Sequence, residues 1–196
     1  PTYENYVEQF EIFIGKITNG GILVYNEDDA EVKRVSEAAT NPIRKLPYST
    51  PAYTVSDGVT LLETPEGPMP IEVFGAHNLN NLAGAKWICQ NMGVDEADFY
   101  EAIASFKGAS KRLEKIAEGK GRVAYKDFAH SPSKVAATTK AVKEQYPNRT
   151  LVACLELHTY SSLNAEFLKE YEGALEYADE AVVFYSPDAV KIKQLE

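Results

Sequence analysis

The sequence predicts an α/β fold with a doubly wound parallel sheet. Three short apolar runs, at 22–25, 151–155 and 181–185, have the continuous hydrophobicity of strands buried on both faces of such a sheet. Segments with helical spacing of apolar residues alternate with these runs, as they do in strand–helix–strand units. The 196 residues are enough for one sizeable domain or two small ones.

The chain begins with a pattern typical of an amphipathic helix. Apolar residues recur near every third or fourth position from Tyr6 to Ile17, and they predict a helix over 3–16. The strand at 22–25 comes next. A short helix is expected over 30–39.

The segment that follows is rich in proline, which interrupts any helical pattern. Four short β-type runs are interpreted as a small meander: 43–48, 52–55, 59–63 and 71–74. A helix is expected over 77–92, with Gly93 as its C-cap, and another from about 95 to 105.

The linker-like segment 106–111 is the best candidate for a domain boundary, which divides the chain into 1–106 and 107–196. Beyond it the sequence predicts a β-hairpin, a helix that starts at Ser131 and Pro132, a strand, a helix and a last strand. These elements are expected at 113–117 with 122–125, at 131–146, at 151–155, at 162–177 and at 181–185.

The composition limits the possible partners. A net charge of −9 argues against a non-specific nucleic-acid binder, because phosphate would be repelled at long range. No apolar run approaches the ~20 residues of a membrane helix, so no membrane partner is expected. Cys89 and Cys154 lie in apolar runs and are expected to be buried, reduced thiols of a cytoplasmic protein. The sequence leaves the oligomeric state open.

Two glycine-containing segments do not fit a phosphate-binding loop. Gly15 and Lys16 match the end of such a loop, but Ile17 stands where Ser or Thr must hold the metal, and Phe10 replaces the first glycine. The segment 119–121 precedes a predicted strand, whereas a dinucleotide fingerprint follows one. It is therefore interpreted as a hairpin turn.

The start of the helix predicted at 77–92 carries a possible nucleotide-binding motif. Asn78 and Asn81 are three residues apart and share one face of the first turn. An amide group offers a donor and an acceptor together, which matches the N6 and N7 edge of adenine. The alternative is that His77 or Asn78 only caps the helix, as Asn often does.

A second set of polar residues lies in the other half of the chain. Asp127 and His130 follow a predicted strand and precede a helix, which is the sheet edge where doubly wound folds bind ligands. Asp127 can accept hydrogen bonds from ribose hydroxyls, and His130 can face phosphate. The alternatives are a turn residue and a capping contact. Arg112 follows the linker, where a solvated surface position is the alternative.

In this order and spacing, three motifs resemble the Mur ligase family: Gly75-x-His-Asn-x-x-Asn81, Phe106-x-Gly108 with Arg112-Leu-Glu114, and Asp127-Phe-Ala-His-x-Pro132. The resemblance covers nearly the whole chain. It implies the end of a central ATPase domain, followed by most of a C-terminal Rossmann-like domain. Within the family the motifs look closest to ligases that join L-alanyl-γ-D-glutamyl-meso-diaminopimelate to UDP-N-acetylmuramate, and next closest to those that join L-alanine.

The resemblance implies that ATP activates the muramate carboxylate as an acyl phosphate, which an amine then attacks, with Mg²⁺ offsetting the negative charge. His77, Asn78, Asn81, Arg112 and Asp127 would bind ATP. His130 would lie near the phosphates or the incoming amine, as the catalytic candidate.

The family's phosphate loop and magnesium carboxylates are expected upstream of this sequence, so the chain alone is expected to be inactive. Two other interpretations stay open: a non-catalytic α/β module that binds a nucleotide or a protein, and a structural domain without ligand. Leu157 and Thr159 stand where the family commonly has Pro and Arg, which bears on the amine contacts.

Overall fold

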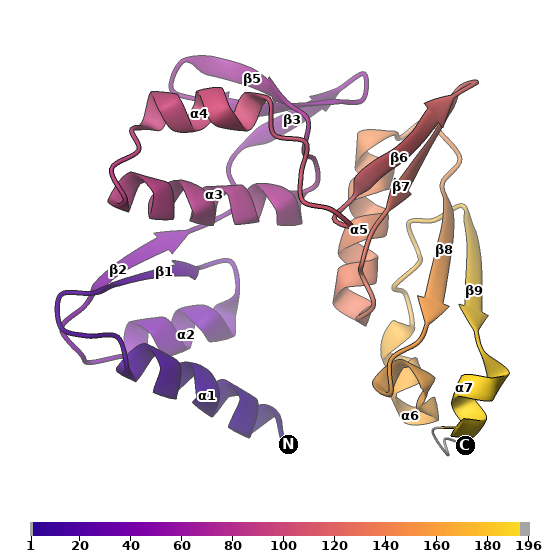
Figure 1. The fold of residues 1–196 in the computed structure, drawn as a ribbon, viewed down its shortest axis with the longest axis horizontal. Coiled ribbons are helices and arrows are strands. Elements are labelled where there is room, and N and C mark those ends of the chain that lie inside the picture. Colours follow the sequence, from indigo (N-terminus) through magenta and orange to yellow (C-terminus); the bar gives the residue numbers. More distant parts are fainter. Residues whose placement is uncertain (1, 193–196) are drawn as a thin grey trace. The chain divides into compact units, whose positions relative to one another are not determined.

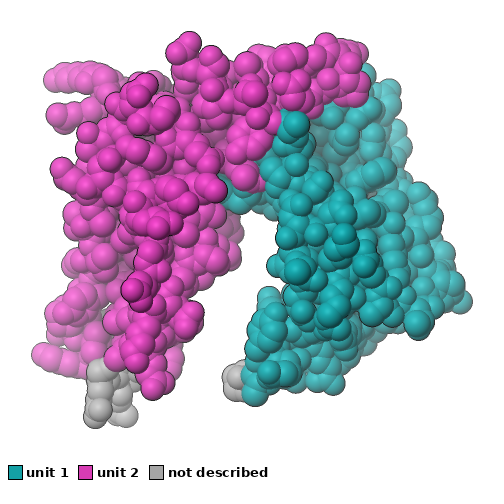
Figure 2. Space-filling model, turned by 180° about the vertical axis from the view of Figure 1, so that it is seen from behind, with its two compact units in different colours: residues 1–52, 77–104 teal, residues 53–76, 105–196 magenta. Residues whose placement is uncertain are grey.

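The computed structural model describes residues 2–192 and has a mixed α/β architecture (Figure 1). The chain divides into two compact units, which Figure 2 colours separately. Unit 1 comprises Pro1–Ala52 and His77–Ala104, and unit 2 comprises Tyr53–Ala76 and Ser105–Glu196. The predicted α/β class is confirmed. The predicted boundary between residues 106 and 107 stays a prediction.

Unit 1 begins with α1 (Tyr3–Gly15), as the apolar spacing predicts. The Oγ1 atom of Thr2 accepts the N–H of Asn5 at 3.2 Å and caps the helix. Val7 and Ile14 are the buried residues of α1, and they contribute to a small core that also includes β1 and α2. The buried members of this core are Val7, Ile14, Leu23, Tyr25 and Val35.

Two parallel strands form the sheet of unit 1. β1 (Ile22–Asn26) pairs in register with β2 (Arg44–Tyr48), and α2 (Ala30–Ala38) forms the crossover between them. The sequence places 43–48 in a meander, and this prediction is wrong. A parallel pair needs a crossover of a dozen or more residues, and the helix between the two strands provides it.

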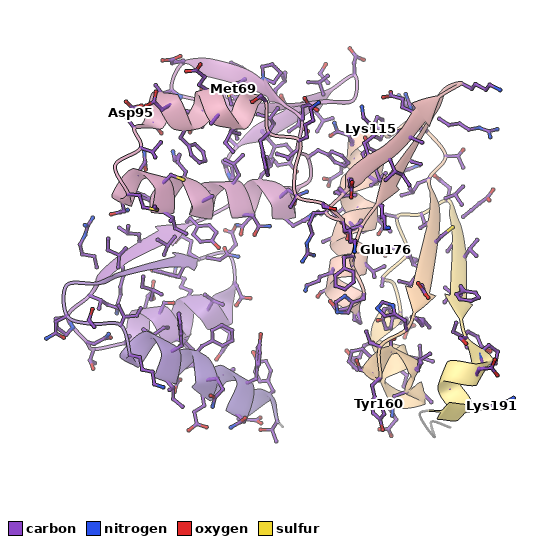
Figure 3. The ribbon with its side chains drawn as sticks, in the orientation of Figure 1. Met69, Asp95, Lys115, Tyr160, Glu176 and Lys191 are labelled. Atoms are coloured by element: carbon purple, nitrogen blue, oxygen red, sulfur yellow. The ribbon has the colours of Figure 1, made fainter. Side chains whose placement is uncertain are left out.

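The remaining helices of unit 1 are α3 (Ala76–Asn91) and α4 (Glu96–Ala104). Both predicted helices are confirmed. The Oδ1 atom of Asp95, labelled in Figure 3, accepts the N–H of Asp98 at 2.9 Å and caps α4. The turn between the helices uses Gly93 at a φ of 96°, a conformation that favours glycine.

A three-stranded antiparallel sheet opens unit 2. Its strands are β3 (Tyr53–Ser56), β4 (Val59–Thr64) and β5 (Gly67–Ile71), with β4 in the centre. The last strand lies at 67–71 instead of the predicted 71–74. The strand contains prolines at 68 and 70, which an edge strand tolerates because it does not need every N–H for pairing.

The rest of unit 2 contains a hairpin, a long helix and a parallel strand pair. The hairpin is β6 (Glu114–Gly119) with β7 (Arg122–Lys126), and α5 spans Pro132–Gln145. β8 (Val152–Leu157) pairs in parallel with β9 (Glu180–Tyr185). The predicted positions of these elements are confirmed. β9 is exposed along its whole length, contrary to the buried strand that its apolar run predicts.

The prediction of one helix over 162–177 is wrong. Short pieces replace it: η1 (Ser161–Leu163), α6 (Ala165–Leu168) and η2 (Lys169–Tyr171). The side chain of Asn164 accepts two N–H groups and starts a new helix there. A last helix, α7, spans Pro187–Ile192.

The environment of the cysteines also differs from expectation. Cys89 is half-buried and Cys154 on β8 is exposed, so the predicted pair of buried thiols is wrong. The apolar runs around them predict strands or helices, but they do not specify which side of an element faces the core.

Candidate functional site

The first two turns of α3 carry three of the candidate residues. α3 begins at Ala76, so the residue at the cap position is Gly75, which has a φ of 86°. His77, Asn78 and Asn81 therefore lie inside the helix, and neither His77 nor Asn78 occupies the cap position. Asn81 is exposed, and the other two are half-buried.

Next to these residues lies a polar cluster, defined as Asn26, Asp28, Thr50 and Asn80. The Nδ2 group of Asn80 donates to Oδ2 of Asp28 at 3.0 Å, to Oγ1 of Thr50 at 3.1 Å and to Oδ1 of Asn26 at 3.3 Å. Asn26 ends β1, and Thr50 follows β2, so the cluster lies at the carboxyl ends of two parallel strands. The motif analysis missed all four residues.

α3 approaches β2 closely at Gly84. A Cβ atom at this position would lie 2.9 Å from the Cζ atom of Tyr48. The small side chain is therefore a packing requirement. Leu79 and Leu82 on the same helix are buried.

In unit 2, Asp127 has a clear structural role. Its Oδ2 atom accepts the N–H of Leu113 at 2.7 Å, and its Oδ1 atom accepts the N–H of Ala129 at 2.6 Å and the hydroxyl of Thr138 at 3.4 Å. Leu113 has a φ of 47°, in the left-handed region that disfavours branched side chains. Asp127 thus fixes a strained loop beside Arg112.

The loop that carries Arg112 is also held by Glu114. The Oε2 atom of Glu114 accepts the N–H of Lys111 at 2.8 Å and the hydroxyl of Ser110 at 3.1 Å. The N–H of Lys111 is the main cause that lowers the pKa of Glu114. The side chain of Arg112 is exposed. The structure thus brings Arg112 and Asp127 into one loop region of unit 2.

His130 belongs to a group of aromatic rings at the carboxyl ends of β7 and β8. Its Nδ1 atom lies 2.9 Å from the carbonyl oxygen of Phe128, and the backbone carbonyl oxygen of His130 accepts the hydroxyl of Tyr171. The ring centroids of His130 and Phe128 are 5.1 Å apart, and those of His130 and His158 are 6.1 Å apart. Sequence reasoning did not single out His158, although it directly follows β8.

A groove of about 910 Å³ lies beside these residues in unit 2. Its walls come from β7, α5 and β8. Asp127 and Ala129 line it, together with Val135, Thr138 and Leu155. The groove therefore reaches the sheet edge at which the sequence places the second set of candidate residues.

The described residues show no candidate metal centre. Within 2–192, no group of three or more His, Cys, Asp or Glu residues is arranged to hold a metal ion. No helix in this part of the chain is long and apolar enough to cross a bilayer.

Comparison with known proteins gives a consistent family assignment. No family model matches the chain. The chain is 30% identical over 186 residues to a UDP-N-acetylmuramate–L-alanine ligase from Caldicellulosiruptor bescii, an alignment that covers 89% of the chain and 40% of that protein. It is also 30% identical over 194 residues to the same ligase from Renibacterium salmoninarum, covering 93% of the chain and 42% of the relative.

A solved structure shares the fold. The UDP-N-acetylmuramate-alanine ligase from Thermotoga maritima superimposes with a TM-score of 0.66 and 19% identity, over 98% of this chain and 44% of that one. The chain thus spans less than half the length of these proteins. Together the similarities support the Mur ligase family for this chain.

Proposed function

We propose that this chain is part of an ATP-dependent ligase that joins L-alanine to UDP-N-acetylmuramate, as a cytoplasmic step of peptidoglycan synthesis. The observation that supports the proposal most strongly is the 30% identity to an L-alanine ligase over 89% of the chain. The motifs alone favour the tripeptide as the amine substrate. The sequence relatives favour L-alanine, so L-alanine is the amine in this proposal.

Asn78 and Asn81 are proposed to bind the adenine ring. Their amide groups lie in the first two turns of α3, and each side chain can donate and accept at the same base edge. The N–H groups at the start of the helix favour negative charge, and His77 lies in the same turn beside the nucleotide.

In unit 2, Arg112 and Asp127 are proposed to contact the ribose and phosphates. Arg112 is exposed and carries the positive charge that phosphate requires. The carboxylate of Asp127 already accepts three hydrogen bonds from its own chain. A carboxylate has about four lone-pair positions, so a ribose hydroxyl can use the fourth.

His130 is the proposed catalytic residue. Because the carbonyl of Phe128 can only accept, the Nδ1 atom of His130 carries the proton at this contact. The Nε2 atom is then the one that can accept a proton from the amine or, once protonated, face a phosphate. No resolved residue is assigned to Mg²⁺, because no suitable ligand group is present in 2–192.

ATP supplies the phosphoryl group that activates the muramate carboxylate. The residues of this chain bind the nucleotide and move a proton at His130. The geometry within each unit supports the contribution that is proposed for it.

The test is ligation by the full-length protein that carries this segment. Purified enzyme is incubated with ATP, Mg²⁺, UDP-N-acetylmuramate and either L-alanine or L-alanyl-γ-D-glutamyl-meso-diaminopimelate, and the product mass is measured. The proposal predicts that L-alanine is joined and that ADP is released in equal amount. If only the tripeptide is joined, the tripeptide and not L-alanine is the amine substrate. If neither amine is joined, the result favours a non-catalytic binding module.

A further inference from the structure

The polar cluster of Asn26, Asp28, Thr50 and Asn80 connects the helix of the candidate site to the sheet of unit 1. Oδ2 of Asp28 accepts three hydrogen bonds: from the N–H of Thr50 at 2.8 Å, from the hydroxyl of Thr50 at 3.0 Å and from Asn80 at 3.0 Å. Oδ1 of Asn26 accepts the N–H of Asp28 at 3.0 Å as well as the amide of Asn80. Every member thus contacts at least two others.

The bonds of this cluster are directional and involve a charge. A hydrogen bond to a carboxylate is roughly twice as strong as one between neutral groups. The amide of Asn80 has only two hydrogens for its three acceptors, so it is held from three sides. Asn80 is half-buried and Asp28 is exposed, so water competes less for the contacts of Asn80 with Asn26 and Thr50 than for its contact with the carboxylate.

The position of Asn80 on α3 explains what these bonds fix. With 3.6 residues per turn, successive residues are about 100° apart around the helix axis. Asn78 and Asn81 are therefore about 60° apart on one flank, whereas Asn80 lies about 160° from Asn78 and about 100° from Asn81. Leu79 and Leu82, both buried, lie between the two flanks.

Apolar packing alone leaves the helix some rotational freedom. The burial of Leu79 and Leu82 is favourable but non-directional, so it tolerates a small rotation of the helix about its axis. A rotation of 20° would swing Asn78 and Asn81 away from a ligand edge, at about the limit of productive geometry. The bonds of Asn80 oppose such a rotation because they attach the opposite flank to the strand ends.

We infer that Asn80 and Asp28 are positioning residues, which set the rotation of α3 and thereby the direction in which Asn78 and Asn81 meet the nucleotide. The inference rests on the proposed function for its link to ATP. The anchoring of the helix itself follows from the contacts in unit 1 alone. The role is positional because neither residue is proposed to contact the nucleotide.

The first experiment measures backbone amide exchange at residues 79–84 in Asn80→Ala. Asn80→Ala removes the donor of three hydrogen bonds, one of them to an exposed carboxylate, so exchange here is expected to accelerate about tenfold. Asn91→Ala is the matched control, because Asn91 is on the same helix and its Nδ2 group donates to the carbonyl of Trp87 at 2.7 Å. Equal exchange in Asn80→Ala and the wild type would overturn the anchoring.

The second experiment uses the full-length enzyme and its steady-state kinetics. Asn80→Ala is expected to raise the KM for ATP about tenfold while kcat changes less than about threefold, because the binding groups are misdirected and the reacting groups are untouched. Asn91→Ala should change neither. Faster exchange with an unchanged KM would retain the anchor but refute its link to the nucleotide. An enzyme that neither binds nor hydrolyses ATP would refute the proposed function and leave the exchange result standing.

A residue swap separates positioning from general loss of stability. Asn80→Asp alone places two carboxylates together and should impair ATP binding. Combined with Asp28→Asn it restores one carboxylate and one amide at the same contact, so the KM for ATP should return to within about threefold of wild type. If the double variant is worse than Asn80→Asp, the contact does not act as inferred.

Discussion

The substitution Gln145→Leu tests how the three-stranded sheet is attached to α5 within unit 2. Gln145 is 5% exposed; its Nε2 group donates to the carbonyl oxygen of Gly58 at 2.6 Å, and its Oε1 atom accepts the hydroxyl of Thr60 at 2.9 Å. Thr60 is fully buried. The two contacts join segments far apart in the sequence.

Leucine is close to glutamine in size, so the substitution removes the two hydrogen bonds without a large cavity. Each buried group that loses its partner costs about 1–3 kcal/mol. Gly58 is half-buried, so the cost of leaving its carbonyl unpaired is at the low end of this range. Thr60 is fully buried, so the cost for its hydroxyl is at the high end. The expected loss for Gln145→Leu is about 3 kcal/mol, which is a fall in Tm of about 6–12 °C for a protein of this size.

A double-mutant cycle with Thr60→Val gives the sharper test, measured by thermal unfolding followed by circular dichroism. Because the double variant removes both partners of one hydrogen bond, its cost should be smaller than the sum of the single costs by about 1–2 kcal/mol. Gln9→Leu, at an exposed position on α1, is the control and should change the Tm by less than about 2 °C. Additive costs in the cycle would refute the coupling.

Three further substitutions test other parts of the structure. Gly84→Ala should lower stability by about 0.5–2 kcal/mol because the new Cβ meets the ring of Tyr48, whereas Gly15→Ala, with open space around its Cβ, should be neutral or stabilising; urea unfolding compares the two. Asp127→Ala should cost about 2–3 kcal/mol by the same measurement, and an unchanged midpoint would show that its three contacts are weak. The ammonium of Lys143, 2.7 Å away, and the N–H of Leu151 lower the pKa of Asp179. This carboxylate therefore stabilises the fold above the ordinary Asp pKa of about 4, and the contribution is lost as the pH falls through its folded value. Asp179→Asn should lower the Tm at pH 7, and the difference should vanish near pH 2; a difference that persists there would contradict the ionic cause.

The elements that could be predicted are those whose pattern is decided locally. α1 and α5 have helical spacing and recognisable starts, and the hairpin turn around Lys120 has the glycines that a tight turn requires. The apolar runs of β1 and β8 likewise identify strands. These signals depend on neighbouring residues and not on the rest of the fold.

Some of the missed features depend on contacts between distant segments. The pairing of β2 with β1 is decided by the α2 crossover, and no property of β2 alone distinguishes it from a meander strand. The break in the helix predicted at 162–177 has a local cause, because the side chain of Asn164 accepts the N–H groups of Glu166 and Phe167. The site depends on distant contacts: Asn80 was passed over because its partners are 30 to 54 residues away in the sequence.

The measurement that most directly tests the central claim is the KM for ATP of the full-length enzyme carrying Asn78→Ala. Asn78 lies in the first turn of α3 and is proposed to read the adenine edge. The KM should rise about tenfold or more, as for the loss of a good base contact, while Asn91→Ala at the other end of α3 leaves it unchanged. An unchanged KM in Asn78→Ala would contradict the assignment of this helix to the nucleotide.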